Sequence, residues 1–227
     1  MVMKTLHTQK VVIIGTGGMG REVLWMLKTH NQIDSRLRYD VLGFLTNASQ
    51  EHDTRVCEMP VLGPEGWVVG KRNIHAICAI GDPRHRRRLT MNLETQGVSF
   101  ISVIDPSVKM SEFVNIGKGC ILCAGVVLTT QVSIGNHVIV NINSTINHDT
   151  VLEDYVTIGP GATLTGRTRL GYGAEIGANA TIIPRKEVGR GSIVGAGAVV
   201  TRNIGENKVA AGVPARVIKM LPVDQRL

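Results

Sequence analysis

The sequence predicts a small Rossmann-like α/β domain with a parallel sheet, followed by an all-β parallel β-helix. Two observations carry this fold class. Over residues 10–105, short apolar runs alternate with segments of helical pattern, as in a parallel sheet whose strands are joined by helices. From residue 104 to residue 200, an aliphatic residue recurs at every sixth position without a break. We therefore expect a first domain over residues 1–103 and a second over residues 104–227.

The first domain is expected to alternate strands and helices. The expected strands are residues 11–14, 41–45, 75–80 and 100–104, and the expected helices are residues 21–31 and 84–96. Val11 to Ile14 form the uninterrupted apolar run of a buried strand, and Gly97 ends the second helix. This succession of strand, helix and strand favours a small parallel sheet.

The second domain follows from its period of six. That period does not fit an α-helix with ~3.6 residues per turn, but it fits short strands. A small or apolar residue lies four positions after each repeated aliphatic residue, as at Val126 and Ala162, and Lys186 is the one clear exception. This residue and the next aliphatic one are two positions apart, so both face the same side of a strand.

The chain must turn at the remaining positions of the repeat. They hold residue types that tolerate a positive φ: Gly117, Gly119, Gly135, Asn136, Asn147, Gly159, Gly171, Gly173, Gly177, Gly189, Gly191, Gly195 and Gly197. The result is a solenoid of flat coils around a stacked aliphatic core. The composition agrees, because the 227 residues include 26 glycines but only 3 Phe, 3 Tyr and 2 Trp.

Charge and cysteine content restrict the partners. The net charge of +7 is spread along the chain, which argues against nucleic acid. The one dense basic run, residues 84–88, is either a solvated helix face or part of a pocket for a small anion. Four cysteines without a paired CxxC set offer no disulfide framework and favour a reducing cytoplasm. No apolar run reaches the ~18 residues of a membrane span, and the N-terminal apolar stretch is too short for a secretion signal.

A glycine-rich loop connects the first strand and the first helix. Gly15, Gly17 and Gly20 form a GxGxxG pattern, and with Gly18 they are interpreted as making room for a phosphate-bearing ligand at a helix N-terminus. A tight turn without a ligand is the other interpretation. A dinucleotide-binding dehydrogenase is disfavoured, because it needs an acidic residue after the second strand and this chain has Thr46 there.

Two histidines fall at predicted corners of the solenoid, outside the core. His148 lies two positions after Ile146, and His137 occupies a neighbouring corner position. Spacing alone leaves both eligible as functional residues. Asp149 favours His148, because a carboxylate can orient an imidazole or raise its basicity. A zinc hydratase similar to γ-class carbonic anhydrases would need three histidine ligands, and the repeats offer two, so no metal is expected.

The repeats resemble the left-handed β-helix of hexapeptide acyltransferases, and Ala211 to Arg216 resemble the usual end of that domain. Residues 13–22 and 79–84 resemble the sugar acyltransferases of the sialic-acid O-acetyltransferase type, which include N-acetyltransferases acting on UDP-4-amino sugars and on GDP-perosamine. The resemblance implies a left-handed β-helix, acetyl-CoA as co-substrate and a homotrimer with active sites between neighbouring subunits.

The resemblance also implies roles for single residues. It makes His148 the general base, assisted by Asp149, and the backbone N–H of Gly166 the donor to the oxyanion. The residues implied to bind acetyl-CoA are Thr157, Gly166, Ala178 and Ala196. The residues implied to bind a nucleotide sugar are Gly17, Gly18, Met19, Thr46, Asn47 and Gly81.

Some positions depart from the family pattern. Relatives often have an acidic pair at Thr46 and Asn47, and a second histidine at Thr157. Arg202 and Lys208 are either partners for the CoA phosphates or solvated residues. The function expected from the whole sequence is N-acetylation of a nucleotide-linked amino sugar by direct transfer. The alternatives are O-acetylation of a free sugar such as sialic acid, and a non-catalytic module that binds a sugar nucleotide.

Overall fold

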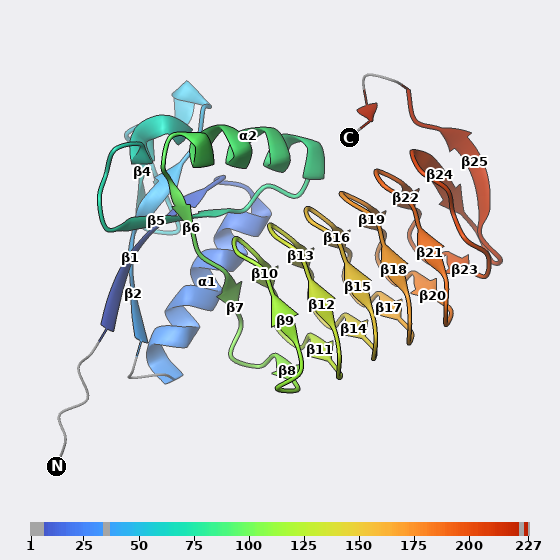
Figure 1. Cartoon of the computed structure of the whole chain (residues 1–227). Helices are drawn as coiled ribbons and strands as arrows, with labels where there is room; N and C mark the ends of the chain where they lie inside the picture. The colour runs from blue at the N-terminus through green and yellow to red at the C-terminus, as the bar shows by residue number, and fades with distance from the viewer. Residues whose placement is uncertain (1–6, 34–36, 223–224, 227) are drawn as a thin grey trace, which may run out of the picture.

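The computed structural model describes residues 7–33, 37–222 and 225–226. The N-terminal part is a six-stranded sheet in the order β3-β4-β2-β1-β5-β6, in which β3 and β4 pair antiparallel and the other neighbours parallel. Its strands are β1 (His7–Ile14), β2 (Leu37–Leu45), β3 (Arg55–Val56), β4 (Met59–Gly63), β5 (Ile74–Cys78) and β6 (Ser99–Phe100). The helices are α1 (Gly18–Ile33) and α2 (Pro83–Thr95), with short 3-10 helices η1 (Ser49–Glu51) and η2 (Glu65–Val68) (Figure 1).

Alternate residues of strand β1 face the two helices. Val11 and Ile13 belong to one buried cluster with residues of α1, whereas Val12 and Ile14 belong to another with residues of α2. Both faces of the strand are covered, which explains its uninterrupted apolar run. The small parallel sheet predicted from the sequence is confirmed.

Three local expectations need correction. Helix α1 begins at Gly18, directly after the glycine loop and ahead of the expected start at residue 21. The single strand expected at residues 100–104 is divided between two sheets, because β6 ends the first sheet and β7 (Val103–Ile104) begins the solenoid. The β3–β4 pair was not expected. Its turn holds Cys57 and Glu58 at positive φ. Cys and Glu rarely adopt this conformation, so their presence in the sequence does not indicate a turn.

The second domain is a left-handed parallel β-helix with three sheets. The first sheet contains β7, β10 (Ile121–Leu122), β13 (Ile139–Val140), β16 (Thr157–Ile158), β19 (Glu175–Ile176), β22 (Ile193–Val194), β24 (Lys208–Ala211) and, antiparallel at the end, β25 (Arg216–Met220). The second contains β8 (Lys109–Met110), β11 (Val127–Leu128), β14 (Thr145–Ile146), β17 (Thr163–Leu164), β20 (Thr181–Ile182) and β23 (Val199–Val200). The third contains β9 (Asn115–Ile116), β12 (Ser133–Ile134), β15 (Val151–Leu152), β18 (Arg169–Leu170) and β21 (Glu187–Val188).

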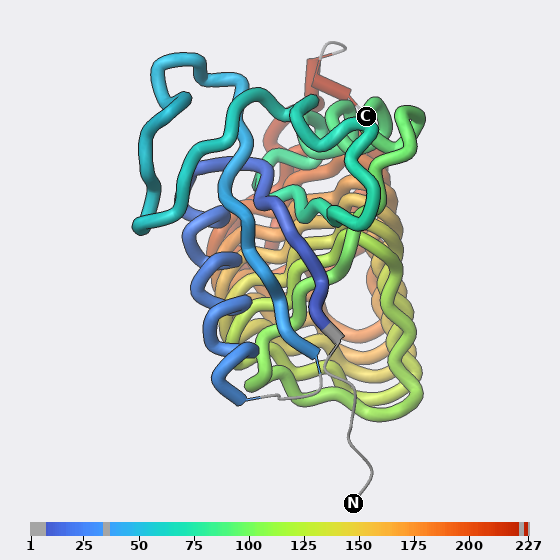
Figure 2. Tube along the Cα trace, turned by 90° about the vertical axis from the view of Figure 1, so that its left-hand side faces the viewer, coloured from blue at the N-terminus to red at the C-terminus, as the bar shows by residue number. Residues whose placement is uncertain are grey.

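Three six-residue repeats make one coil. Each strand pairs with the strand eighteen residues away, as Leu122 pairs with Val140 and Val140 with Ile158. The coils therefore stack in register along the solenoid, and α1 lies against the first coils, beside β7 (Figures 1 and 2). Residues eighteen apart form columns at the three corners, so the register decides which side chains become neighbours.

The repeated aliphatic side chains fill the interior, as predicted. Together with residues such as Val126 and Ala162 they form one buried cluster of aliphatic, alanine and cysteine side chains. Met110 is the exception, because its side chain is 47% exposed. It lies in β8, the end strand of the second sheet, where no preceding coil covers it.

Glycine has a different role at the corners from the one expected. Every sixth residue from Gly119 to Gly197 has a positive φ, but His137 and Asp149 are among them, so the turn does not require glycine. Most of the glycines expected to supply the turn directly follow an inward aliphatic residue and have no positive φ. A Cβ on Gly159 would lie 2.6 Å from the backbone nitrogen of Ala178 in the next coil. These glycines are needed because neighbouring coils approach closely.

The two domains share a buried core. Leu24 and Leu27 of α1 cluster with Ile121 and Ile139, which point outward from the first sheet of the β-helix. Further along this outward column come the polar residues Thr157 and Glu175, which face the basic residues of α2. The N-terminal domain is thus seated on one sheet of the solenoid.

Candidate active site

His148 stands at the corner between β14 of the second sheet and β15 of the third. Its side chain is 54% exposed, and its Nδ1 lies 2.8 Å from Oδ2 of Asp149. Asp149 has a φ of 59°, which turns the chain at this corner. When Nδ1–H donates to the carboxylate, the lone pair of Nε2 is available to accept a proton from a substrate.

The carboxylate of Asp149 is kept ionised. Its hydrogen bond with His148, together with the nearby guanidinium of Arg167, lowers the pKa of Asp149. Nε of Arg167 lies 3.6 Å from the same Oδ2. The acceptor for the imidazole N–H therefore stays charged at neutral pH, and Arg167 is a neighbour that the sequence reasoning missed.

Gly166 is the corner residue one coil beyond His148. A Cβ at this position would lie 2.4 Å from both Cε1 and Nε2 of the His148 imidazole. The absent side chain therefore leaves the space in which the ring stands. The adjacent backbone is fixed, because the N–H of Arg167 donates to the carbonyl of His148 at 2.8 Å. The role of the Gly166 N–H as oxyanion donor stays a prediction.

A cavity of about 420 Å³ opens beside His148. It is lined by His148, Gly166, Arg167, Pro184, Arg185 and Lys186. The cavity is basic, because three of these residues are cations, and a basic site suits an anionic substrate.

The three cations were not among the sequence candidates. Lys186 was available as a signal, since it alone breaks the pattern of small or apolar residues in the repeat. Arg202 and Lys208 do not line this cavity. Arg202 is exposed one coil beyond Pro184, and the ammonium group of Lys208 lies beside Gly205.

The other corner histidine, His137, is fully buried. Its Nε2 lies 2.9 Å from Oε1 of Glu94 in α2, and this oxygen also pairs with Lys118. Burial lowers the pKa of His137, so its ring is neutral at pH 7. The structure thus separates the two histidines, because a substrate can reach His148 but not His137.

A second group of candidates meets at the carboxyl edge of the N-terminal sheet. Its members follow β1, β2 and β5, and β1 lies between the other two strands. The connections leave β1 toward β2 and arrive at β5 on its other side, which is the arrangement where open α/β sheets bind ligands. The structure brings together the six predicted residues Gly17, Gly18, Met19, Thr46, Asn47 and Gly81 at this edge.

The glycines of the first loop serve two purposes. A Cβ on Gly20 would lie 1.9 Å from the carbonyl oxygen of Gly15, so these two glycines are required by the turn itself. Gly17 and Gly18 are exposed, and a Cβ on either would meet no atom within 4 Å. Gly15 and Gly20 therefore shape the turn, and Gly17 and Gly18 leave open space beside it; phosphate binding by this loop stays a prediction.

Thr46 and Asn47 hold the neighbouring loops. The hydroxyl of Thr46 accepts from the N–H of Ala48, and Nδ2 of Asn47 donates to Oε2 of Glu65 at 2.6 Å. Oδ1 of Asn47 accepts from the N–H of Glu65, whose carboxyl pKa is raised by burial. Their contact with a substrate stays a prediction.

The basic run at residues 84–88 is divided, because His85 and Arg88 are exposed whereas Arg84 and Arg86 contact the β-helix. Arg86 is fully buried and donates to backbone carbonyls and to the hydroxyl of Thr157. Arg84 lies 3.1 Å from the carboxylate of Glu175. The interpretation as a solvated helix face is wrong for these residues, because they join α2 to the β-helix.

One chain does not bring the predicted acetyl-CoA residues together. Thr157 lies in β16 of the first sheet, with its hydroxyl bonded to Arg86, whereas Gly166 lies at the corner of the second and third sheets. Ala178 and Ala196 lie at the corner of the first and second sheets. Their joint contact with one CoA molecule stays a prediction.

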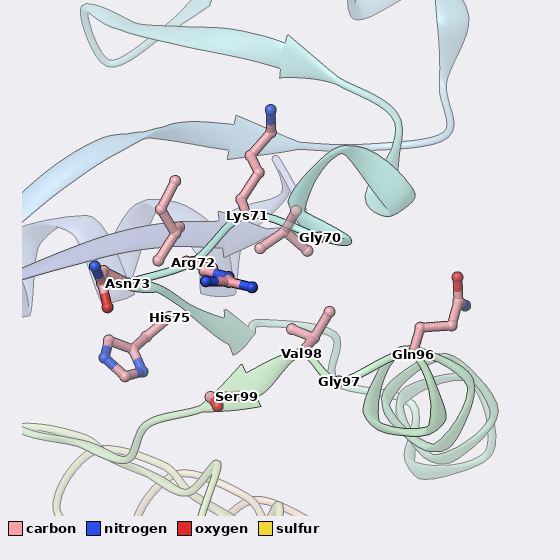
Figure 3. A pocket seen from close by; sticks show the side chains of 11 residues that line it. Gly70, Lys71, Arg72, Asn73, His75, Gln96, Gly97, Val98 and Ser99 are labelled. Carbon is pink, nitrogen blue, oxygen red and sulfur yellow. The ribbon is translucent and has the colours of Figure 1, made fainter.

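Another cavity, of about 580 Å³, lies at the opposite edge of the N-terminal sheet (Figure 3). Lys71 and Arg72 precede β5, Gln96 precedes β6, and Ser99 is the first residue of β6. This amino edge is remote from the Gly81 loop, which follows the carboxyl end of β5. It contains none of the predicted site residues.

Two further searches cover the described residues. No group of three or more His, Cys, Asp or Glu side chains there is placed to hold a metal ion. Within the same ranges, neither helix combines the length and the apolar character that a membrane span needs.

Comparisons with known proteins agree with this architecture. Residues 10–93 match the PglD N-terminal domain family, and residues 131–166 match the bacterial transferase hexapeptide family. No curated protein matches the chain. The acetyltransferase domain of PglB from Neisseria gonorrhoeae, solved with acetyl coenzyme A, is 30% identical over 93% of this chain and 100% of its own, with a TM-score of 0.85.

Two other solved structures are similar. A histidine-to-asparagine mutant of perosamine N-acetyltransferase from Caulobacter crescentus, in complex with CoA and GDP-perosamine, is 30% identical over 92% of this chain and 97% of its own, with a TM-score of 0.84. WeeI from Acinetobacter baumannii is 29% identical over 93% of this chain and 100% of its own, with a TM-score of 0.82. The chain therefore belongs to the hexapeptide-repeat sugar acyltransferases that include the PglB acetyltransferase domain and perosamine N-acetyltransferase.

Proposed function

We propose that this sugar acyltransferase transfers an acetyl group from acetyl-CoA to the amino group of a nucleotide-linked sugar, with His148 as general base. The observation that carries the proposal is the imidazole of His148, half-exposed in a basic cavity, with Nδ1 held by an ionised Asp149. The similar perosamine N-acetyltransferase was solved with CoA and GDP-perosamine, which supports the two substrate classes.

The chemistry requires one base and one oxyanion donor. The neutral amine of the sugar attacks the thioester carbonyl carbon, a C–N bond forms, and Nε2 of His148 takes the proton of the amine. The negative charge that develops on the carbonyl oxygen needs a preorganised donor, and we assign this role to the backbone N–H of Gly166, the residue next to the imidazole. The C–S bond then breaks, and the CoA thiolate takes a proton from the imidazolium.

The nucleotide portion is proposed to bind at the carboxyl edge of the N-terminal sheet. Helix α1 has no acidic residue in its first turn, and Gly17 and Gly18 leave open space before it. The N-terminus of α2 is already capped, since the carboxylate of Asp82 accepts from the N–H of His85 at 2.8 Å. A phosphate is therefore better accommodated at α1 than at α2.

The active site is proposed to be shared between subunits of a homotrimer. His148 lies at the corner of the second and third sheets, whereas Gly81 contacts Thr157 on the first sheet. The corner that carries His148 is the one that the first sheet does not touch. Two copies, arranged so that this corner faces the neighbour's first sheet, would complete the site.

A cytoplasmic location stays a prediction.

The proposal is tested by following thiol release from acetyl-CoA with a panel of UDP-, GDP- and dTDP-linked amino sugars. We expect at least one to react, and the His148→Ala variant to turn over about 10²–10⁴-fold more slowly. Reaction with free sialic acid alone would favour O-acetylation. Tight nucleotide binding without thiol release would favour a non-catalytic module, and wild-type turnover in His148→Ala would exclude the mechanism.

A further inference from the structure

The guanidinium of Arg86 is the most heavily bonded buried group at the domain junction. Arg86 is 0% exposed, and Nε donates to the carbonyl of His137 at 2.9 Å. Nη2 donates to the carbonyl of Tyr155 at 2.8 Å and to the hydroxyl of Thr157 at 2.9 Å. Nη1 donates to the carbonyls of Ile80 at 2.7 Å and Gly81 at 2.8 Å. All five N–H groups of the guanidinium are used.

These acceptors belong to two parts of the molecule. Ile80 and Gly81 form the turn after β5, which is part of the proposed nucleotide-sugar edge, whereas the other acceptors belong to two successive coils of the β-helix. None of the five is a carboxylate. Burial lowers the pKa of Arg86 to about 10, so the residue is still charged at neutral pH. Its charge is therefore balanced by oriented carbonyl dipoles at fixed positions.

Thr157 closes the contact from the other side. Its hydroxyl accepts from Arg86 and donates to the carbonyl of Gly81 at 3.3 Å. The carbonyl of Gly81 is thus held both by α2 and by β16, and Gly81 itself has open space beside it. Two side chains therefore hold the exposed Gly81 part of this turn, while Ile80 packs against the buried cluster beside α2.

Fixing two successive carbonyls also fixes two N–H groups. In a planar trans peptide the N–H points opposite to the C=O. Because the carbonyls of Ile80 and Gly81 point toward Arg86, the N–H groups of Gly81 and Asp82 point away from it. Asp82 itself carries a carboxylate, which contacts the N–H of His85 and the guanidinium of Arg84. An uncharged acceptor oxygen, such as a base carbonyl or a ribose hydroxyl, therefore suits this pair better than a phosphate.

We propose that Arg86, together with Thr157, is a positioning residue that sets the N–H groups of Gly81 and Asp82 to receive an uncharged oxygen of the nucleotide. This inference rests on the proposed function. Relatives often have a histidine at the position of Thr157. The inference gives this threonine a role in holding the turn at Ile80 and Gly81, which differs from the expected contact with CoA.

The chain offers a matched control one helical turn further along α2. Thr90 is also fully buried, and its hydroxyl bonds the hydroxyl of Tyr155 at 3.1 Å. This contact also joins α2 to the β-helix but does not reach Gly81. Thr90→Val therefore removes a junction hydrogen bond of similar burial without touching the turn.

The experiment measures UDP, GDP and dTDP binding by calorimetry and amide hydrogen exchange at Gly81 and Asp82. The variants are Arg86→Lys, Thr157→Val, Thr157→Ser and Thr90→Val. We expect Arg86→Lys and Thr157→Val to weaken binding about tenfold and to speed exchange at the turn. Thr157→Ser should restore the nucleotide affinity and the slow exchange that Thr157→Val loses. Thr90→Val should lower only the melting temperature. The affinity for acetyl-CoA should not change among the four variants in the way that the nucleotide affinity does.

Several outcomes would overturn the inference. Equal affinity and exchange in Thr157→Val and Thr90→Val would show that Arg86 and Thr157 are only structural. If Arg86→Lys does not fold, the comparison of Thr157→Val with Thr157→Ser still tests the inference. If the wild type binds none of the three nucleotides, the proposed substrate class is wrong, and exchange at Gly81 and Asp82 then decides alone whether Arg86 sets the turn.

Discussion

The imidazole of His137 stacks on the phenol ring of Tyr155, with ring centroids 5.2 Å apart and planes 12° from parallel. Both rings lie under α2, where the Glu94 carboxylate forms a hydrogen bond with Nε2 of His137. Glu94, Lys118 and Arg86 are the charged groups whose interactions face this imidazole. A histidine placed in this way makes folding stability depend on pH.

The first prediction concerns this dependence. Burial lowers the pKa of His137 below 6.5, so the unfolded chain takes up a proton before the folded protein does. The free energy of unfolding should therefore fall as the pH drops below about 6.5, by about 1.4 kcal/mol for each unit by which the pKa is lowered. Chemical denaturation between pH 8 and pH 5.5 measures it. The His137→Gln variant keeps a donor for Glu94 but does not titrate, and an equal slope in both proteins would contradict the prediction.

The second prediction concerns Gly166. In Gly166→Ala, the new methyl group would occupy the place of the His148 imidazole, so the ring must move. We expect kcat to fall about 10²-fold, because displacing a catalytic group by about an ångström costs this much. Gly66→Ala is the control, since a Cβ there meets no atom within 4 Å. Unchanged kcat in Gly166→Ala would show that His148 is not positioned by this glycine.

The third prediction concerns the cations of the His148 cavity. Arg185→Gln and Lys186→Gln should each raise the KM for the anionic substrate about two- to fivefold and reduce its dependence on ionic strength. Arg169→Gln makes the same charge change where the side chain pairs with Glu153, outside the cavity. An equal effect of Arg169→Gln would attribute the change to net charge instead of to the site.

The fourth prediction concerns the sharing of the site. His148→Ala and Gly18→Asp are each expected to be nearly inactive, the second because its carboxylate repels the phosphates. Mixed oligomers formed by refolding the two variants together should regain part of the wild-type activity, because His148 and Gly18 of one chain would serve different sites. Light scattering should give a trimer. A fully active monomer, or mixtures without any recovery, would exclude a shared site.

The sequence predicted the β-helix well because each coil repeats one local rule. An inward aliphatic residue every six positions restricts the stacking register to multiples of six residues, and the observed register of eighteen places His148 beside Gly166. The corner glycines were explained wrongly, since close approach between coils cannot be seen in a single repeat. The role of Arg86 was hidden for a similar reason, because its three partners in the β-helix lie 51 to 71 residues away in the sequence.

The candidate site was predicted in part. His148 and Asp149 are neighbours in the chain, so their contact follows from local geometry. Arg167 and Arg185 join them only through the eighteen-residue register, and no spacing rule for cations points to them. Lys186 was visible as a break in the apolar pattern, but an isolated irregularity does not specify a function.

The eighteen-residue register also restricts how the length of this domain can change. Removing a whole coil shifts every later residue along the axis but keeps it at the same corner. Removing one repeat of six residues would rotate everything beyond it by a third of a turn, so that Ala178 would take the side of the solenoid now held by another column. The stacked part of the solenoid can therefore be lengthened or shortened only by complete coils of eighteen residues if the corner columns are to be kept.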